Sequence, residues 1–266
     1  MTTQIDINQA GRGVTMDISQ EIVTANTPEL ITTTGAGAWT KPAGITRVLV
    51  ECWGGGGAGG GCTTNNTGGA SGAGGQYARK TITYESAQQS ISYSVAASVA
   101  GTTGNGANGN DTTWETNVVV AKGGTGGLAN RTDEVDTLGN TTGGVGDVVY
   151  RGGNGGGGRF LDGGGVNPDI VGNNTAGGGA GPDGPGADTI SPNTAGDFAG
   201  LGGAGLNVNS LISSGEVGNP GNNYGGAGSG GAKFSGPSKA GGAGAQGLIR
   251  ITTYNISQRG VPIQSV

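Results

Sequence analysis

The chain alternates between short runs of apolar residues and long glycine-rich segments. Residues 45–53 read I-T-R-V-L-V-E-C-W, which places Val48, Val50 and Cys52 on one face of an extended strand. Leu49 and Trp53 then lie on the opposite face. Alternation with a period of two, in β-branched and aromatic residues, predicts a β-strand. The same pattern predicts strands at residues 76–84, 91–99, 114–121, 147–151 and 247–254.

These strands predict an all-β protein built on one core. No stretch of ten residues or more has the period of an amphipathic helix, so we expect essentially no α-helix. If residues 247–254 return to residues 45–53, everything between them belongs to a single domain. We therefore expect a β-sandwich with a jelly-roll-like core, and we expect the glycine-rich segments to form a second layer on it.

Glycine makes up 64 of the 266 residues, and only five of these glycines precede Trp53. Glycine loses more conformational freedom on folding than any other residue, so such runs stay disordered unless their backbone is well bonded. A flexible linker is one interpretation, but serine is sparse and strands interrupt the runs. Collagen is another, but glycine at every third position lasts for three triplets at most.

A bundle of polyglycine II helices fits the glycine runs better. Such a helix has the extended three-residue turn of polyproline II and makes no internal hydrogen bonds. Glycine keeps its N–H group and lacks a Cβ, so neighbouring helices can approach closely and bond laterally through the backbone. Hydrogen-bonded backbone would then replace the apolar core that the composition lacks.

Charge and the absence of histidine exclude several function classes. The net charge is −5 with only 13 scattered Lys and Arg residues, which argues against binding of nucleic acid. No apolar run is long enough to span a membrane, and the first residues do not form a secretory signal. Without histidine, the ordinary catalytic triads and His-based metal sites are excluded, and no phosphate-binding loop motif occurs. We therefore expect no enzyme and no cofactor.

Two local motifs suggest metal or disulfide chemistry only weakly. Cys52 and Cys62 are joined by flexible glycines and could form a bridge, although two free thiols in a half-buried or buried setting are the simpler interpretation. The segment G-A-N-G-N-D at residues 106–111 partly matches a calcium-binding repeat. A single imperfect copy cannot form the stacked sites of that motif, so we interpret it as a tight turn.

The stretch G-A-W-T-K-P-A-G-I-T-R-V-L-V-E-C-W followed by the first glycine run resembles the glycine-rich domain of bacteriophage tail fibres and tail-tip adhesins. The resemblance continues through Q-Y-A-R-K-T-I-T-Y and I-S-Y-S-V to the closing G-L-I-R-I-T-T-Y, and it covers about residues 35–254. It implies a β-sandwich that carries polyglycine II helices, with distal loops that contact the bacterial surface.

The resemblance implies a virion protein without enzymatic activity, a receptor-binding adhesin at a tail fibre or tail tip. Its location would be the virion, after synthesis in the host cytoplasm. Its partners would be other virion proteins and a bacterial surface protein or glycan. The resemblance leaves open whether the chain forms a homotrimer. Only 34 residues precede the domain, which points to a small terminal adhesin or a short appendage. The alternative is a structural decoration or connector protein of the virion.

We divide the chain into an arm at residues 1–34 that docks on the virion, a domain at residues 35–254, and a tail at residues 255–266. The docking candidates are alternating aliphatic residues of the arm: Ile5, Ile7, Ile18, Ile22 and Val23. The receptor-binding candidates are bulky residues stranded among glycines: Arg159, Phe160, Leu161, Phe198, Leu201, Tyr224, Lys233 and Phe234. Alternatively, these side chains cap the bundle or fill its junction with the sandwich. Trp39, Trp53 and Trp114 are expected in the core.

Overall fold

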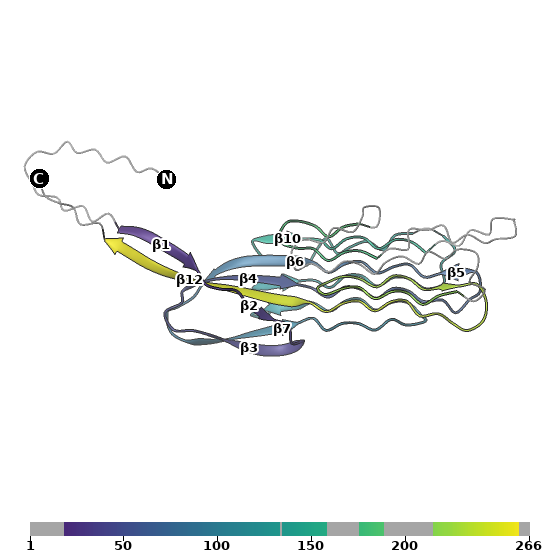
Figure 1. Ribbon diagram of the computed structural model, residues 1–266, viewed down its shortest axis with the longest axis horizontal. Helices are drawn as coiled ribbons and strands as arrows, with labels where there is room; N and C mark the ends of the chain where they lie inside the picture. The colour runs from purple at the N-terminus through teal and green to yellow at the C-terminus, as the bar shows by residue number, and fades with distance from the viewer. Residues whose placement is uncertain (1–18, 134, 159–175, 189–214, 261–266) are drawn as a thin grey trace, which may run out of the picture.

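The computed structural model describes residues 19–133, 135–158, 176–188 and 215–260 and shows an all-β protein (Figure 1). No helix occurs among these residues, so none of them forms a helix that could cross a membrane. The strands are β1 (Ser19–Ala25), β2 (Glu29–Ile31), β3 (Gly35–Lys41), β4 (Arg47–Trp53), β5 (Thr67–Gly68), β6 (Tyr77–Thr83), β7 (Gln89–Val95), β8 (Thr112–Trp114), β9 (Val119–Ala121), β10 (Val148–Tyr150), β11 (Ala232–Lys233) and β12 (Leu248–Gly260).

Two antiparallel sheets form a sandwich. The larger has the order β1-β12-β4-β6-β10, with β2 also paired to β12, and the smaller has the order β3-β7-β8-β9. β12 pairs directly with β4, with Leu248 opposite Trp53. The last predicted strand therefore pairs with the first within one sheet. The jelly-roll detail of the prediction is not confirmed.

The apolar core lies between the two sheets. Val48, Val50 and Cys52 of β4 face it, as the alternation predicted, and they meet residues of the smaller sheet such as Ile91 and Val95. The three tryptophans are buried, at 7%, 1% and 0% exposure: Trp39, Trp53 and Trp114. Trp53 lies in a second, smaller cluster with Tyr77, Ala180 and Leu248 on the other face of the larger sheet.

Two predicted strands differ from the observed ones. The strand predicted at residues 114–121 is a hairpin of β8 and β9, in which Trp114 pairs with Val119. The polar residues Glu115 and Thr116 take positive φ values of 46° and 61° and reverse the chain. The strand predicted at residues 91–99 ends at Val95, after which the backbone enters the glycine-rich layer.

The glycine-rich segments form a bundle that is held by backbone hydrogen bonds. Residues 54–62 are all buried and occupy its centre. Their N–H groups donate in a strict three-residue rotation to three antiparallel neighbours, over N···O distances of 2.7–3.0 Å. The acceptors are Gln76, Ala73 and Ala70 for residues 54, 57 and 60; Asn110, Ala107 and Gly104 for residues 55, 58 and 61; and Ala245, Gly242 and Lys239 for residues 56, 59 and 62.

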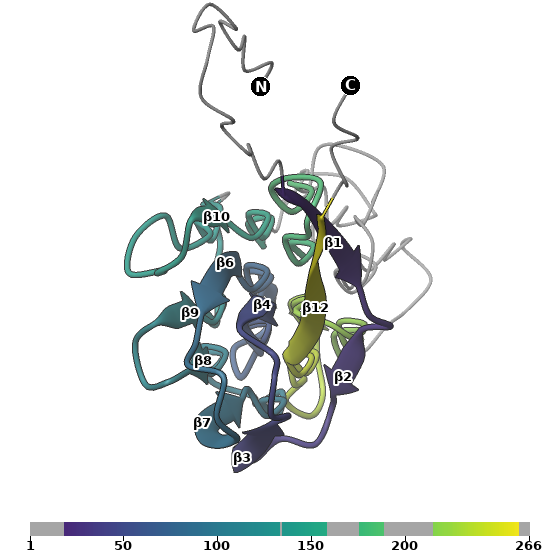
Figure 2. The same ribbon diagram turned by 90° about the vertical axis from the view of Figure 1, so that its left-hand side faces the viewer.

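The carbonyl groups of the same central segment accept from two further neighbours. Gly124, Gly127 and Asn130 donate to residues 55, 58 and 61, and Gly228 and Gly231 donate to residues 57 and 60. The residue numbers of the donors rise together with those of the acceptors, so these neighbours run parallel to the central segment. A period of three residues with lateral bonds is the geometry of the predicted polyglycine II bundle. In Figure 2 several of these segments appear as small loops seen along their length.

The close approach of the segments explains why glycine is required. A Cβ at Gly57 would lie closer than 3.0 Å to the carbonyl group of Thr125, and one at Gly72 would meet the carbonyl of Gly57 in the same way. Real Cβ atoms essentially never approach backbone so closely. The bundle is therefore a second core, made of backbone instead of side chains.

β1 and the last half of β12 form a two-stranded ribbon that extends from the sandwich away from the bundle (Figure 1). Ser19 pairs with Gly260 at one end of the ribbon, and Ala25 pairs with Tyr254 at the other. The proposed boundary between residues 254 and 255 thus falls inside β12, and part of the arm belongs to the larger sheet. Ile22 and Val23 on β1 are 39% and 40% exposed.

Cys52 and Cys62 are both free and buried, in agreement with the simpler interpretation of the two thiols. Cys52 lies in the sandwich core, where burial raises its pKa far above the ordinary value of a thiol. Cys62 lies at the far end of the central glycine segment, and its thiol donates to the carbonyl oxygen of Gly231 over 3.2 Å. Burial also raises the pKa of Cys62.

Candidate functional site

A groove of about 720 Å³ lies on the side of the glycine bundle. Its walls are two glycine-rich segments, residues 122–128 and residues 151–155. The loop of residues 135–142 provides the rest of its lining. A volume of this size falls in the range of about 300–1,000 Å³ that is typical of binding sites for small molecules and short segments.

The side chains of the walls come from a three-residue repeat in the sequence. Residues 122–128 read K-G-G-T-G-G-L, and residues 151–154 read R-G-G-N. A helix with three residues per turn places every third side chain on the same row. Thr125 and Leu128 therefore face the groove from one wall, and Arg151 and Asn154 face it from the other.

The loop is fixed to both walls by hydrogen bonds. Thr137 and Gly155 exchange two backbone hydrogen bonds of 2.8 and 2.9 Å. On the other side, the Asn140 amide donates to the carbonyl of Gly123 over 2.5 Å, and the amide of buried Gln76 donates to the carbonyl of Asn140 over 2.8 Å. The loop is therefore fixed by a backbone pair on one wall and by side-chain amides on the other.

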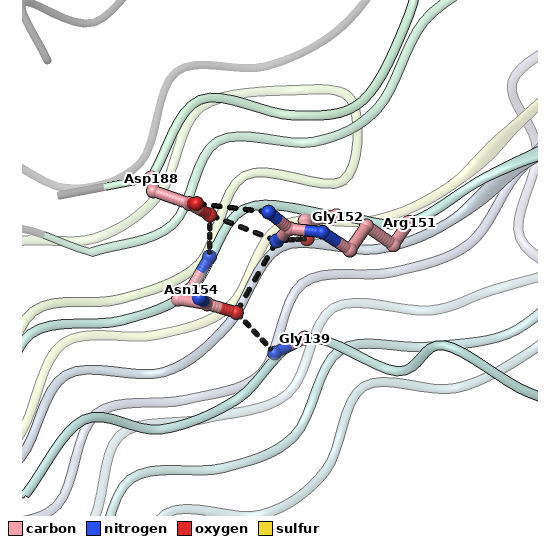
Figure 3. Close-up of polar contacts among 5 residues, drawn as sticks. All are labelled: Gly139, Arg151, Gly152, Asn154 and Asp188. Atoms are coloured by element: carbon pink, nitrogen blue, oxygen red, sulfur yellow. Dashed lines mark hydrogen bonds and ion pairs between the residues drawn. The ribbon is translucent and has the colours of Figure 1, made fainter.

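Arg151, which lines the groove, forms an ion pair with Asp188 (Figure 3). The Arg151 guanidinium donates two hydrogen bonds of 2.8 Å to the two carboxylate oxygens of Asp188. The N–H of Asn154 donates to Asp188 over 2.7 Å, and the side-chain oxygen of Asn154 accepts from the N–H of Gly139 over 2.8 Å. The hydrogen bonds from Arg151 hold the pKa of Asp188 below its usual value and raise the pKa of Arg151.

Three aliphatic side chains of the groove lining are exposed to solvent. Leu128 is 45% exposed, Val135 is 46% exposed and Leu138 is 69% exposed. Large apolar side chains that gather at a hollow of the surface commonly mark a site of interaction.

The described residues show no group of three or more Cys, Asp or Glu side chains that could hold a metal ion. The carboxylate of Asp136, which lines the groove, accepts a hydrogen bond of 3.1 Å from the N–H of Gly157. That carboxylate therefore helps to anchor the loop to the bundle. The expectation that the chain is not an enzyme stays a prediction.

The predicted receptor-binding residues fall at different places. Lys233 lies on β11 at the end of the bundle that is far from the ribbon (Figure 1). It is 6% exposed, and its ammonium group donates to the carbonyl of Thr63 over 2.6 Å. Phe234 follows it and is half-buried. Tyr224 packs against the Trp53 cluster, at the junction between bundle and sandwich.

The other predicted site residues lie outside the described residues: Arg159, Phe160, Leu161, Phe198 and Leu201 among the receptor candidates, and Ile5, Ile7 and Ile18 among the docking candidates. The sequence analysis did not select the groove residues, because it sought bulky residues between glycines without using their spacing. The repeats K-G-G-T-G-G-L and R-G-G-N carry that signal.

No curated protein matches this chain. The family comparison does find a match: the profile of the glycine-rich domain covers residues 32–254. This range contains the smaller sheet, the larger sheet apart from β1, β2 and the end of β12, the glycine bundle and the groove. The chain therefore belongs to the glycine-rich domain family.

Proposed function

We propose that the chain is a bacteriophage virion protein, a receptor-binding adhesin at a tail fibre or tail tip that attaches to the host cell surface. The observation that carries the proposal is that the two ends of the molecule are built differently. The ribbon of β1 and β12 leaves one end of the sandwich, and the glycine bundle ends on the opposite side near β5 (Figure 1). The ribbon end is thus suited to attachment to the virion, and the bundle end is suited to contact with the host cell.

The far end of the bundle carries exposed loops that are anchored by backbone hydrogen bonds. Residues 63–66, 102–105 and 235–238 are all exposed. They are anchored by backbone bonds below them, from Gly61 to the carbonyl of Gly104 and from Cys62 to that of Lys239. Loops positioned by a rigid scaffold are where proteins most often place their binding residues. Phe234 and the candidates outside the described residues remain the proposed contacts.

The ribbon is the proposed site of docking on the virion. An isolated two-stranded ribbon is only marginally stable in water, so a partner that covers it would stabilise it. Ile22 and Val23 expose part of their apolar surface there, and so does Ile256 of β12, at 42% exposure. The partner would be another virion protein, and the virion would be the location of the chain.

The proposal is tested by binding fluorescently labelled, purified chain to a panel of bacteria, with unlabelled chain as competitor. The double variant Thr64→Arg with Thr103→Arg changes two exposed loops at the far end. The matched control, Thr40→Arg with Thr83→Arg, changes two exposed threonines of the sandwich strands. We expect saturable, competable binding to some strains, lost in the first variant and kept in the control.

The absence of binding by folded chain to any strain would contradict the adhesin proposal. It would favour the structural alternative, a decoration or connector protein of the virion. Equal loss of binding in both variants would contradict the assignment of the far end of the bundle as the receptor-binding site.

A further inference from the structure

We propose that the glycine bundle protects its asparagine–glycine pairs from succinimide formation, so that these asparagines become sites of covalent modification only when the bundle opens. This inference goes beyond the proposed function and does not depend on it. The sequence contains three such pairs, and all of them lie in the described part of the bundle: Asn105-Gly106, Asn108-Gly109 and Asn154-Gly155.

Succinimide formation joins an asparagine side chain to the backbone that follows it. The backbone nitrogen of the next residue loses its proton and attacks Cγ. The bond from Cγ to the side-chain nitrogen breaks, and that nitrogen takes up a proton and leaves as ammonia. Water then opens the ring at either carbonyl and gives aspartate or isoaspartate. Glycine as the next residue favours the reaction, because it has no side chain to hinder the attack and turns easily into the required conformation.

The construction of the bundle requires these reactive pairs. The side-chain oxygen of Asn108 accepts from the N–H of Gly126 over 2.8 Å, so asparagine supplies an acceptor to the neighbouring segment. At the next position, a Cβ on Gly109 would lie closer than 3.0 Å to the carbonyl of Gly55, so glycine is required there. The other two pairs follow the same rule: Asn105 accepts from Ala129 and Asn154 from Gly139, while Gly106 lies against Ala58 and Gly155 against Gly72.

The attacking nitrogen of each pair is held by another segment. The N–H groups donate to backbone carbonyls over 2.8, 2.8 and 2.9 Å: Gly106 to Gly127, Gly109 to Gly124, and Gly155 to Thr137. Each of these bonds must break before the nitrogen can lose its proton and turn toward Cγ. The side chain is fixed as well, through the oxygen that accepts from the neighbouring segment. The reaction therefore waits for local opening, and its rate falls in proportion to the fraction of time that the segment is open.

Hydrogen bonding, and not exclusion of water, provides this protection. Asn105 and Asn108 are exposed, and Asn154 is half-buried. Solvent therefore reaches the side chains of the first two pairs in the folded chain. Their protection depends on the bonds between segments and is lost when the bundle opens.

The isoaspartate product is incompatible with the bundle. Aspartate keeps a side-chain oxygen as acceptor, and Asp111 already accepts from the N–H of Gly123 in this way over 2.9 Å. In isoaspartate the main chain runs through the side-chain carbon and gains a methylene group. The residues that follow are then shifted against partners that repeat every three residues. Modification after opening therefore prevents that segment from forming again.

Peptide mass spectrometry of the full chain, incubated at neutral pH under native conditions and in urea, measures the modification at each site. We expect the three asparagines to react in urea at the rate of a free asparagine–glycine peptide. In the folded chain they should react about 100-fold more slowly, or more slowly still, because attack needs an opening of the bundle. Equal rates in the folded and unfolded chain would overturn the proposal.

The variant Asn66→Gly places a new asparagine–glycine pair in the exposed far-end loop of residues 63–66 and serves as the internal control. Glycine suits this position, because Asn66 has a φ of 58°. Asn65 is exposed like Asn105, but it lies in a loop between two bundle segments. We expect Asn65 of the folded variant to react at least about tenfold faster than Asn105. Equally slow reaction of both would show that the bonds of the bundle do not provide the protection, and would overturn the proposal.

Refolding after timed incubation in urea tests the effect of isoaspartate. Refolded chain is separated by size-exclusion chromatography, and its isoaspartate is measured by enzymatic methylation. We expect the refolded chain to be depleted of isoaspartate relative to the starting material. Isoaspartate at the same fraction in both would contradict the incompatibility of this product with the bundle.

Discussion

At the scale of single residues, a glycine in the bundle is required because the backbone of another segment lies where a Cβ would stand. The backbone next to Gly57 is the carbonyl group of Thr125, and the backbone next to Gly56 is that of Gly226. A glycine of the far-end loops differs, because Gly104 has open space where a Cβ would stand. The same residue type is thus indispensable at one position and replaceable at another.

We predict that Gly57→Ala lowers the free energy of unfolding by about 3 kcal/mol or more, because a methyl group would force two bonded segments apart. Gly104→Ala is the matched control and should leave it nearly unchanged. The measurement is urea unfolding followed by tryptophan fluorescence. Equal, small effects of both substitutions would mean that the glycine segments behave as linkers.

A second residue-scale feature is the buried carboxylate of Glu51, which is 2% exposed. The Arg250 guanidinium donates to its two oxygens over 2.6 and 2.7 Å, and the hydroxyl of Tyr77 donates to it over 2.6 Å. Burial and, after it, the hydrogen bond to Glu51 raise the pKa of Tyr77 well above its ordinary value. These contacts tie β4, β6 and β12 together on the face that meets the bundle.

We predict that Glu51→Gln lowers the free energy of unfolding by about 3 kcal/mol, because removal of one partner leaves a largely buried guanidinium without its carboxylate. The control is Asp133→Asn, which removes the partner of Arg131 at a site where Asp133 is 61% exposed. Exposed pairs contribute about 0.2–1 kcal/mol, so the control should change stability far less. Thermal unfolding of both variants checks this, and similar shifts in melting temperature would contradict it.

At the scale of elements, Asn and Asp side chains take the place of a neighbouring segment where the bundle meets solvent. The sequence N-G-A-N-G-N-D places Asn105, Asn108 and Asp111 three residues apart. Their side-chain oxygens accept from the N–H groups of Ala129, Gly126 and Gly123 over 2.8–2.9 Å. Residues 106–111 are therefore a bundle segment, and the prediction of a tight turn there was wrong.

We predict that Asn108→Ala costs about 1–3 kcal/mol, because the N–H of buried Gly126 loses its acceptor. Asn65→Ala, at an exposed asparagine of the far-end loops, is the control and should be neutral. Urea unfolding measures both. A loss of stability in Asn65→Ala as large as in Asn108→Ala would show that the side-chain acceptors of Asn105, Asn108 and Asp111 have no special role in the bundle.

The strands were predictable because alternation in the sequence follows directly from burial on one face. The runs that became β4, β6 and β12 contain β-branched and aromatic residues at a period of two. β3, with the sequence G-A-G-A-W-T-K, was not predicted as a strand, because its small residues carry no such signal. It exists because Trp39 packs in the core and because the whole strand pairs with β7.

The groove was not predictable by the same means, because it depends on how distant segments align. The repeats R-G-G-N and K-G-G-T-G-G-L indicate that each segment has one row of side chains. They do not indicate that the two rows face each other across residues 135–142. That alignment is set by backbone bonds between segments, such as those from Ala73 to Thr125 and from Gly74 to Gly153.

At the scale of the whole molecule, the sandwich, the bundle and the ribbon differ in what stabilises them. The sandwich has an apolar core and the bundle a backbone core, while the ribbon of β1 and the end of β12 has exposed Ile22, Val23 and Ile256. Among the described residues, neither β1 nor the part of β12 that follows Ile251 contributes a residue to either buried cluster. The ribbon is therefore independent of the cores.

We predict that removal of residues 1–26 together with residues 255–266 leaves the sandwich and the bundle folded, with a melting temperature within a few degrees of the intact chain. Under the proposed function, the same truncation should abolish incorporation into virions while binding to bacteria is kept. Circular dichroism during heating measures the first effect. Collapse of the fold on truncation would show that the ribbon supports the cores.

Amide hydrogen exchange tests the central claim, that glycine backbone forms a second core, most directly. The structure predicts strong protection for residues 54–62 and 69–76, close to that of the core strands β4 and β12, because each of their N–H groups is buried and bonded to another segment. The N–H groups of the exposed loop residues 102–105 should exchange quickly in the same experiment. Exchange of residues 54–62 at the rate of an unstructured chain would contradict the account.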